Sequence, residues 1–274
     1  MTYSIAEIAC MLNISGFEND RRPVSILLTD SRSLTDASQS LFFALSTPTN
    51  DGHNYITDLY RHGVRAFVVT HIHDGSADTM PDAAFIIVPD VTTALQSIAK
   101  AHRMRFKAPV IGITGSAGKT TVKEWLYSIL GSSSLVDRSP RSYNSQIGVP
   151  LSVWGISDKA DYAIIEAGIS RSGEMSALRG IIKPDIGIIT GIGHEHDEGF
   201  ESLDRKCREK LSLFTGCHTV IFNADDQLIR NAVSAVCHDA KLVSCSRHDA
   251  SCALFVEQTL CHDSSTALIY NFQG

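Results

Sequence analysis

The chain has 274 residues, of which 43% are hydrophobic and 20% charged, and its formal net charge is −6. This composition predicts a globular protein of about two domains, and the lack of a basic run argues against a nucleic-acid surface. No apolar run of 18 residues and no basic-apolar leader appears, which favours a cytoplasmic protein without a membrane span. Seven cysteines without C-x-x-C spacing indicate reduced thiols rather than disulfides or a zinc site.

The first hundred residues predict a compact α/β unit. Apolar spacing predicts strands and helices in the following order: helix 3–14, strands 24–29 and 40–45, helix 55–62, strands 66–70 and 84–88, and helix 91–104. Polar turns follow the first two strands, at Asp30-Ser31-Arg32 and at 49–53, which includes Asp51 and His53, and the second of them could face a ligand. A new apolar pattern starts at Pro109, so we expect two domains, 1–107 and 108–274.

The stretch 110–121, VIGITGSAGKTT, predicts a phosphate site. A β-branched run is followed by a turn with two glycines, and Lys119 then opens a helical pattern. Backbone N–H groups of such a turn point at an anion, a lysine adds positive charge, and a threonine hydroxyl can bind magnesium. The motif has the short form T-G-x-x-G-K-T, because Ile113 stands where the longer form has its first glycine. An ordinary strand-turn-helix explains the glycines, but not the lysine together with Thr120 and Thr121.

After this loop, strands and helices alternate, which predicts an α/β fold with a mostly parallel, buried sheet and helices on both faces. The predicted strands are 110–114, 162–167, 186–190 and 219–223, and the predicted helices are 119–130, 174–181 and 203–214. Ligands of such sheets bind at the carboxyl ends of the strands. The polar residues that follow the strands are therefore the candidate functional residues.

Glu166 ends an apolar strand, where an unpaired carboxylate would be costly to bury. It suits magnesium binding beside the phosphate loop, and the alternative is an ion pair with a lysine or arginine. The loop 193–199, GHEHDEG, offers two histidines and three carboxylates. Their spacing is a weak zinc signal, so a magnesium-nucleotide role and a solvated loop both stay open.

Three polar segments allow more than one interpretation. Asn144 and Ser145 could orient a substrate or a metal-bound water, or could cap a helix. Lys210 lies in the charged helix DRKCREKLSLF, and by itself this pattern predicts a solvated surface lysine. The segment 223–226 closes the last predicted strand as a plain turn or as a nucleotide contact.

The motifs TGSAGKTT, YNSQIGVPLS, IIEAG followed by GEM, and IGHEHDEGFES followed by REK resemble those of the ATP-dependent Mur ligases, which build the peptide of bacterial peptidoglycan. The stretches TDSRS, LFFAL and NDGHNYI are similar to the nucleotide-sugar-binding domain of the later members. SPRSYNSQIGVPLSVW and REKLSLF also resemble a branch in which the ligase is fused ahead of an alanine racemase. The resemblance therefore implies a small N-terminal α/β domain for the UDP-sugar substrate and a P-loop-type α/β ATPase domain.

The resemblance assigns roles to single residues. ATP would be held by the phosphate loop, namely Thr114, Gly115, Ser116, Ala117, Gly118, Lys119, Thr120 and Thr121. Magnesium would be held by Thr120, Glu166, His196 and Lys210, the last of them carbamylated. Lys119, His196 and Lys210 would be catalytic. The substrate would contact Asn144 and Ser145 with its peptide, and Asp30, Ser31, Arg32, Asp51 and His53 in the N-terminal domain.

The implied reaction adds D-alanyl-D-alanine to UDP-N-acetylmuramoyl-tripeptide through an acyl phosphate, with ATP and Mg²⁺. The implied ligase is a monomer, or a dimer if a racemase domain follows. Ala117, Ser145 and Gly191 stand where the family usually has asparagine. The family's third, C-terminal domain is not recognised, so a truncated, non-catalytic binding fragment is one alternative. Folylpolyglutamate synthase is another, although TDSR and NDGHNYI argue against it.

Overall fold

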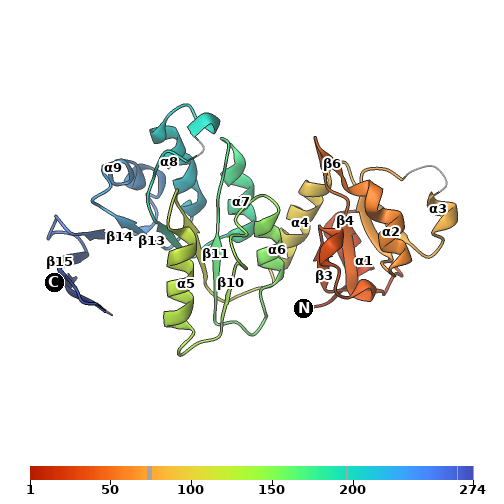
Figure 1. The fold of residues 1–274 in the computed structure, drawn as a ribbon, viewed down its shortest axis with the longest axis horizontal. Helices are drawn as coiled ribbons and strands as arrows, with labels where there is room; N and C mark the ends of the chain where they lie inside the picture. The colour runs from red at the N-terminus through yellow and green to blue at the C-terminus, as the bar shows by residue number, and fades with distance from the viewer. Residues whose placement is uncertain (73–75, 196, 264, 274) are drawn as a thin grey trace. The chain divides into compact units, whose positions relative to one another are not determined.

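The computed structural model describes residues 1–72, 76–195, 197–263 and 265–273. The chain packs into two units, Met1–Arg105 and Phe106–Gly274 (Figure 1). Among the described residues, no helix has both the length and the apolar character needed to cross a bilayer. All seven cysteines are free thiols, and Cys207, Cys217 and Cys237 are buried.

The first unit is built on a parallel four-stranded sheet in the order β3-β4-β7-β8. These strands are β3 (Ile26–Leu28), β4 (Ser40–Phe43), β7 (Ala66–Val69) and β8 (Ala84–Ile87). The helices are α1 (Ile5–Met11), α2 (Ile56–Arg61), α3 (Ser76–Thr79) and α4 (Val91–Arg103). Short elements complete the unit: antiparallel pairs β1 (Tyr3–Ser4) with β2 (Pro23–Val24) and β5 (Ser46–Thr47) with β6 (Asn50–Asp51), and 3₁₀ turns η1 (Ser31–Ser33), η2 (Ala37–Gln39) and η3 (Gly52–Tyr55).

Every predicted strand and helix of the first unit is confirmed, and the predicted lengths are too long. The helix expected over 3–14 starts only at Ile5, because Ser4 is its N-cap. The Ser4 side chain accepts from the Glu7 N–H, and the Glu7 carboxylate accepts from the Ser4 N–H, which forms a capping box. The sheet closes over a core that includes Phe42, Phe67 and Val69.

The second unit contains an eight-stranded sheet in the order β10-β11-β9-β12-β13-β14-β15-β16. The strands are β9 (Val110–Thr114), β10 (Val136–Arg138), β11 (Tyr162–Glu166), β12 (Ile186–Ile189), β13 (Thr219–Asn223), β14 (Lys241–Ser246), β15 (Leu254–Cys261) and β16 (Thr266–Phe272). All neighbours run parallel except the last pair, β15 and β16. The predicted mostly parallel α/β fold is therefore confirmed.

Helices cover both faces of this sheet. They are α5 (Lys119–Leu130), α6 (Gly148–Trp154), α7 (Glu174–Ile182), α8 (Leu203–Leu211) and α9 (Gln227–Val236), with 3₁₀ turns η4 (Asp197–Gly199) and η5 (Ser212–Phe214). Helix α5 packs against β9, β10 and β11, whereas α6 contacts α7, α7 contacts η5, and α8 contacts α9. The chain moves along the sheet in one direction from β9 to β10 and in the opposite direction from β10 to β14. Right-handed crossovers therefore put α5 on one face and α6, α7, α8 and α9 on the opposite face. The sheet thus reverses its strand order beside β9, where ligands of such folds bind.

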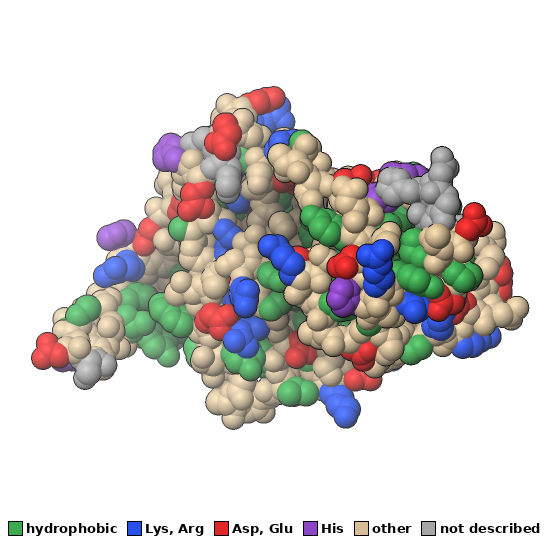
Figure 2. All heavy atoms as spheres, turned by 45° about the vertical axis from the view of Figure 1, so that its right-hand side comes forward, with side chains coloured by type: hydrophobic (Ala, Val, Ile, Leu, Met, Phe, Trp, Pro, Cys, Tyr) green, Lys and Arg blue, Asp and Glu red, His purple; other side chains and the backbone are tan. Residues whose placement is uncertain are grey.

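The C-terminal hairpin of β15 and β16 extends the sheet and was not predicted. Every described residue of β16 is exposed, including Leu268, Ile269, Tyr270 and Phe272. Apolar side chains are accordingly visible at the surface along this hairpin in Figure 2.

Candidate active site

The phosphate loop lies between β9 and α5, as the sequence predicts. Gly115 and Gly118 have φ angles of +142° and +85°, which residues other than glycine rarely adopt. A Cβ on Gly115 would lie 2.1 Å from Thr190 Oγ1, so the position excludes even alanine without rearrangement. Gly118 is the N-cap of α5 and makes no side-chain cap bond, so the first turn of the helix and the positive end of its dipole lie at the phosphate loop.

A second loop, residues 190–193 after β12, fastens the phosphate loop. The Ser116 N–H donates to Gly191 O at 2.8 Å, and the Gly193 N–H donates to Ser116 Oγ at 2.9 Å. Thr190 Oγ1 donates to Ala117 O at 2.6 Å. These bonds hold the loop in shape without a ligand, which lowers the entropic cost of binding an anion.

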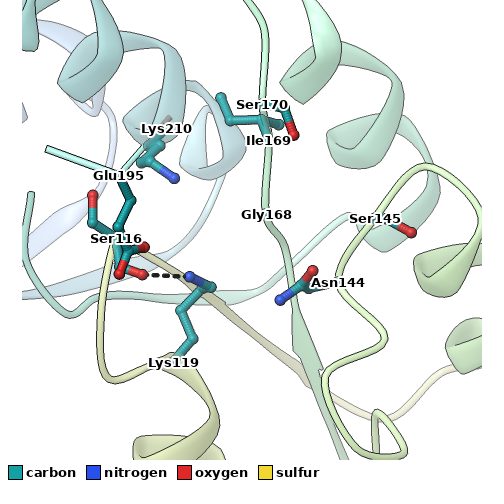
Figure 3. Close-up of a pocket in the computed structure, with 9 residues that line it drawn as sticks. All are labelled: Ser116, Lys119, Asn144, Ser145, Gly168, Ile169, Ser170, Glu195 and Lys210. Atoms are coloured by element: carbon teal, nitrogen blue, oxygen red, sulfur yellow. Dashed lines mark hydrogen bonds between the residues drawn. The ribbon is translucent and has the colours of Figure 1, made fainter. Parts of the chain in front are cut away.

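Lys119 turns back over the loop. Its Nζ donates to Gly115 O at 2.8 Å. It also donates to Ser116 O at 2.7 Å (Figure 3). Burial lowers the pKa of this lysine. A bound phosphate could replace these carbonyls as acceptors, because charge-assisted bonds to an anion are stronger than bonds to a neutral carbonyl. Thr121, also expected to bind nucleotide, is exposed on the first turn of α5.

Glu166 ends β11 beside the loop and is fully buried. Thr120 Oγ1 donates to its Oε2 at 3.1 Å, and Lys123 Nζ lies 2.9 Å from its Oε1. The ion-pair alternative and the magnesium alternative for Glu166 both have structural support. The carboxylate pairs with Lys123 and also accepts from Thr120 of the phosphate loop. In the described chain Oε1 has this charge contact but no hydrogen bond. A carboxylate and a hydroxyl beside a phosphate loop fit Mg²⁺, which is usually held by few protein oxygens together with phosphate.

Lys210 overturns the interpretation as a solvated surface lysine. Only 3% of it is exposed, and its Nζ donates to Gly115 O at 3.2 Å. Helix α8 is highly charged, yet one face with Lys206, Cys207 and Lys210 is buried against the unit. Burial, together with the charges of Lys119 and Lys206, lowers the pKa of Lys210 to about 8.

A cavity of about 100 Å³ gathers these groups (Figure 3). Lys119 from α5 and Lys210 from α8 both point into it. Its lining comes from five segments and comprises Ser116, Lys119, Asn144, Ser145, Gly168, Ile169, Ser170, Glu195 and Lys210. The structure therefore brings together five residues that the resemblance singled out from distant parts of the sequence.

Asn144 and Ser145 are held on the side of the cavity opposite α8. The Gly168 N–H donates to Asn144 O at 2.7 Å, and the Gly148 N–H donates to Ser145 Oγ at 3.1 Å. Ser145 Oγ thus accepts from the first residue of α6, although the N-cap of that helix is Ile147 and has no side-chain cap bond, and Ser145 also lines the cavity.

The histidine loop is anchored by Lys206. This buried lysine donates to Gly193 O at 2.7 Å and also to Glu195 O. His196 itself lies outside the described residues. Over the part of the chain that the structure describes, no group of three or more His, Cys, Asp or Glu could hold a metal ion.

A neighbouring cavity of about 390 Å³ lies at the carboxyl ends of β12 and β13. Its lining includes Ala117, Thr190, His194, Asn223 and Asp226. Asp226 also caps α9 by accepting from the Leu228 and Ile229 N–H groups. The 223–226 turn is therefore both a structural turn and a wall of a pocket that adjoins the phosphate loop.

Sequence reasoning missed four residues of this region: Lys123, Thr190, Glu195 and Lys206. Glu195 belongs to the conspicuous GHEHDEG loop, which was its only signal. The others act on backbone carbonyls or on a carboxylate far away in the sequence, so no local pattern marks them.

The residues expected to bind the substrate in the first unit form two pairs. Arg32 contacts Asp30 at 2.7 Å, and hydrogen bonds from Arg32 hold the pKa of Asp30 at about 2. Ser31 begins the 3₁₀ turn between them. His53 is buried, and its Nδ1 lies 2.6 Å from Asp51 Oδ1. The Thr70 N–H donates to His53 Nε2, so Nδ1 carries the proton and donates to Asp51 Oδ1.

Known proteins are similar to this chain in sequence. The family model for the Mur ligase middle domain matches residues 113–273. The UDP-N-acetylmuramoyl-tripeptide–D-alanyl-D-alanine ligase of Bacillus subtilis is 34% identical over 210 residues, which are 75% of this chain and 45% of that protein.

Solved structures share the fold. MurF from Acinetobacter baumannii superposes with a TM-score of 0.87 at 22% identity, over 99% of this chain and 59% of that one. MurF from Thermotoga maritima, solved in complex with ADP, gives 0.78 at 22% identity over 90% and 56%. The chain thus spans about half the length of the curated relative. From the family match and the sequence identity to this relative, the chain belongs to the Mur ligase family.

Proposed function

We propose that this chain supplies the nucleotide site and the UDP-sugar-peptide site of an ATP-dependent ligase that adds D-alanyl-D-alanine to UDP-N-acetylmuramoyl-tripeptide. The observation that carries the proposal is the 100 Å³ cavity, because Lys119 and Lys210 point into it beside Asn144. Two cations and an amide at the carboxyl ends of the strands suit a phosphate on one side and a peptide carboxylate on the other.

The proposed reaction has two steps. A carboxylate oxygen of the tripeptide attacks the γ-phosphorus of ATP, the bond between that phosphorus and the β,γ-bridging oxygen breaks, and ADP leaves. The amine of D-alanyl-D-alanine then attacks the carbonyl carbon of the acyl phosphate, loses a proton, and expels phosphate. The acyl phosphate is needed because a free carboxylate has no adequate leaving group.

In both steps negative charge collects on oxygens, and the residues of the cavity are placed to stabilise it. Lys119 would move from the Gly115 and Ser116 carbonyls to the β- and γ-phosphates. The loop N–H groups would bind the same phosphates, and Asn144 would orient the peptide. Thr120 and Glu166 would hold Mg²⁺, which neutralises phosphate charge when bound.

The lowered pKa of Lys210, about 8, favours the proposed carbamylation. Only a neutral amine attacks CO₂, and a lower pKa raises the neutral fraction of the lysine near neutral pH. Adding the carbamate would turn a buried cation into an anion beside Lys119, which is a better neighbour for that lysine. His196 remains a proposed metal ligand from the family motif alone.

The first unit is the proposed site for the uridine diphosphate end. Asp30, Ser31 and Arg32 are available at the surface, whereas His53 would act through Asp51. The wall formed by Asn223 and Asp226 is a proposed contact for the base of the nucleotide. We place the reaction in the cytoplasm, where ATP is available.

The test is phosphate release by the full natural protein that contains this chain. We expect substantial phosphate release only when ATP, Mg²⁺, the UDP-tripeptide and D-alanyl-D-alanine are all present, and little phosphate when any one of them is left out. Release with a folate and glutamate instead would support the folylpolyglutamate alternative. No release with any set, by a protein that still binds ADP, would support a non-catalytic binding role.

A further inference from the structure

Lys123 is a buried lysine that the proposed chemistry does not use. It lies one helical turn after Lys119 on α5, and its side chain is fully buried. Its helix neighbours Val122 and Leu126 pack against an apolar core. Burying an ammonium costs several kcal/mol unless partners replace its water. Its partners therefore indicate what the residue does.

The Lys123 ammonium joins three segments. It donates to Ser139 O at 2.9 Å and to Arg141 O, and it lies 2.9 Å from Glu166 Oε1. Glu124 Oε1 is 3.3 Å away, but this carboxylate is half-exposed and also pairs with Arg138. Glu166 is thus the buried anion that Lys123 compensates, and the two carbonyls belong to the chain that leaves β10.

The segment 139–145 accepts two of the Lys123 hydrogen bonds and runs from β10 to the cavity. Arg141 has φ +49°, a left-handed conformation that is strained in a residue with a side chain. Three residues later the same segment delivers Asn144 to the cavity. The Ser139 Oγ accepts from the Glu166 N–H at 3.1 Å, so the segment and the end of β11 are already adjacent. Lys123 fixes both of them to the helix that follows the phosphate loop.

We propose that Lys123 is a positioning residue of this site, which uses one ammonium to hold the Glu166 carboxylate and the 139–145 segment against α5. With Oε1 facing Lys123, Oε2 is left towards Thr120 on the nucleotide side. The same contact sets the distance between the phosphate loop and Asn144. This inference rests on the proposed function for the roles of Glu166 and Asn144, but the positioning itself can be measured without turnover.

If Lys123 and Glu166 formed an ion pair that only stabilises the fold, the Lys123 variants would behave differently from what the positioning role predicts. Such an ion pair would stabilise the fold, and its loss would not change how nucleotide binding depends on magnesium. The positioning role instead couples Lys123 to two separate properties: the order of residues 141–145 and the contribution of Glu166 to magnesium-nucleotide binding.

The first measurement is amide hydrogen exchange in the 274-residue chain carrying Lys123→Met. The Tyr143 and Asn144 N–H groups, which donate to Pro140 O and Ser142 O, should exchange at least ~10-fold faster than in the wild type. The matched control is Lys159→Met, which removes an exposed lysine of the same unit and should leave both rates unchanged. Wild-type rates at these two amides in a folded Lys123→Met chain would overturn the proposal.

The second measurement is ADP affinity with and without Mg²⁺. Lys123→Met should lose at least ~10-fold of the magnesium enhancement, while the metal-free affinity, which depends on the loop and Lys119, changes less than ~3-fold. An unchanged ratio would remove Glu166 from the proposal. If the wild type binds no ADP at all, the proposed function fails, and the exchange rates still decide on Lys123.

If Lys123→Met does not fold, the double variant Lys123→Met/Glu166→Gln replaces it. Removing both charges of a buried pair is far less costly than removing one. Its Tyr143 and Asn144 amides should still exchange faster than those of Glu166→Gln alone, because the Ser139 and Arg141 carbonyls have lost their donor. Equal exchange in the two variants would refute the positioning role.

Discussion

Gly115→Ala is the substitution whose effect the structure defines most closely. The new Cβ would lie 2.1 Å from Thr190 Oγ1 and 3.0 Å from Gly191 O. Thr190 would have to rotate away and give up the hydrogen bond that its single hydroxyl proton makes to Ala117 O, at about 1 kcal/mol. The positive φ of +142° adds about 1–3 kcal/mol of backbone strain. We therefore expect the second unit to lose about 3 kcal/mol of unfolding free energy and its ADP affinity to fall at least ~10-fold.

Urea unfolding followed by tryptophan fluorescence measures this loss in the correct unit, since both tryptophans, Trp125 and Trp154, lie in Phe106–Gly274. Gly118→Ala is the control, because φ is also positive there but the nearest atom is 3.8 Å away, so only strain of about 1 kcal/mol is expected. Thr190→Ala should cost about 1 kcal/mol in the wild type but little in Gly115→Ala, which has already lost the Thr190 bond, so the two substitutions should couple by about 1 kcal/mol. Equal losses at Gly115 and Gly118, with no coupling to Thr190, would refute the argument.

Three further predictions concern the lysines of the cavity. Lys119→Ala should weaken Mg·ADP binding ~30-fold or more, because the charge-assisted bonds of the lysine are lost, and it should not lower the unfolding free energy. Titration calorimetry measures the binding, and an unchanged affinity would remove Lys119 from the site. Lys210→Met should be more stable than the wild type at pH 7 in CO₂-free buffer, because the folded chain no longer buries that charge. The pKa of Lys210 is about 8 when folded and 10.5 as a free side chain, so wild-type stability rises relative to the variant as the pH passes from 8 towards 10.5. The difference in unfolding free energy between Lys210→Met and the wild type should shrink by about 2 kcal/mol between pH 7 and 9.5. A difference that stays constant with pH in urea unfolding would contradict the burial of a charged Lys210. Lys210→Ala should lose turnover in the full natural protein. If a carbamate is used, added short carboxylic acids should restore part of the turnover, and no rescue of a folded variant would count against the carbamate.

Local patterns predicted the elements that frame the site. The bounds of β9, α5 and β13 match the predicted ones, because β-branched runs and glycine turns mark their ends. Helix α6 was missed because Gly148 and Pro150 look like a turn. A proline in the first helical turn is tolerated, since the N–H that it lacks would have no partner there. The exposed β16 lacks the alternation of a half-buried strand, so its pairing with β15 could not be predicted.

The limit of the sequence is clearest for the charged residues. Lys210 and Lys206 look like surface residues of a polar helix, and only the packing of α8 shows that they are buried. Lys123 differs from an ordinary helix lysine only through carbonyls 16 and 18 residues away and a carboxylate on another strand. The family motifs supplied most of the candidate residues, whereas the residues that hold them in place became visible only in three dimensions.

The most direct test of the central claim is oxygen transfer during turnover of the full natural protein. The tripeptide is labelled with ¹⁸O in its terminal carboxylate and incubated with ATP, Mg²⁺ and D-alanyl-D-alanine, and the released phosphate is examined by mass spectrometry. An acyl phosphate requires one carboxylate oxygen to leave with the phosphate, so the account predicts one ¹⁸O in each phosphate released per peptide bond formed. Peptide bond formation with unlabelled phosphate would contradict it.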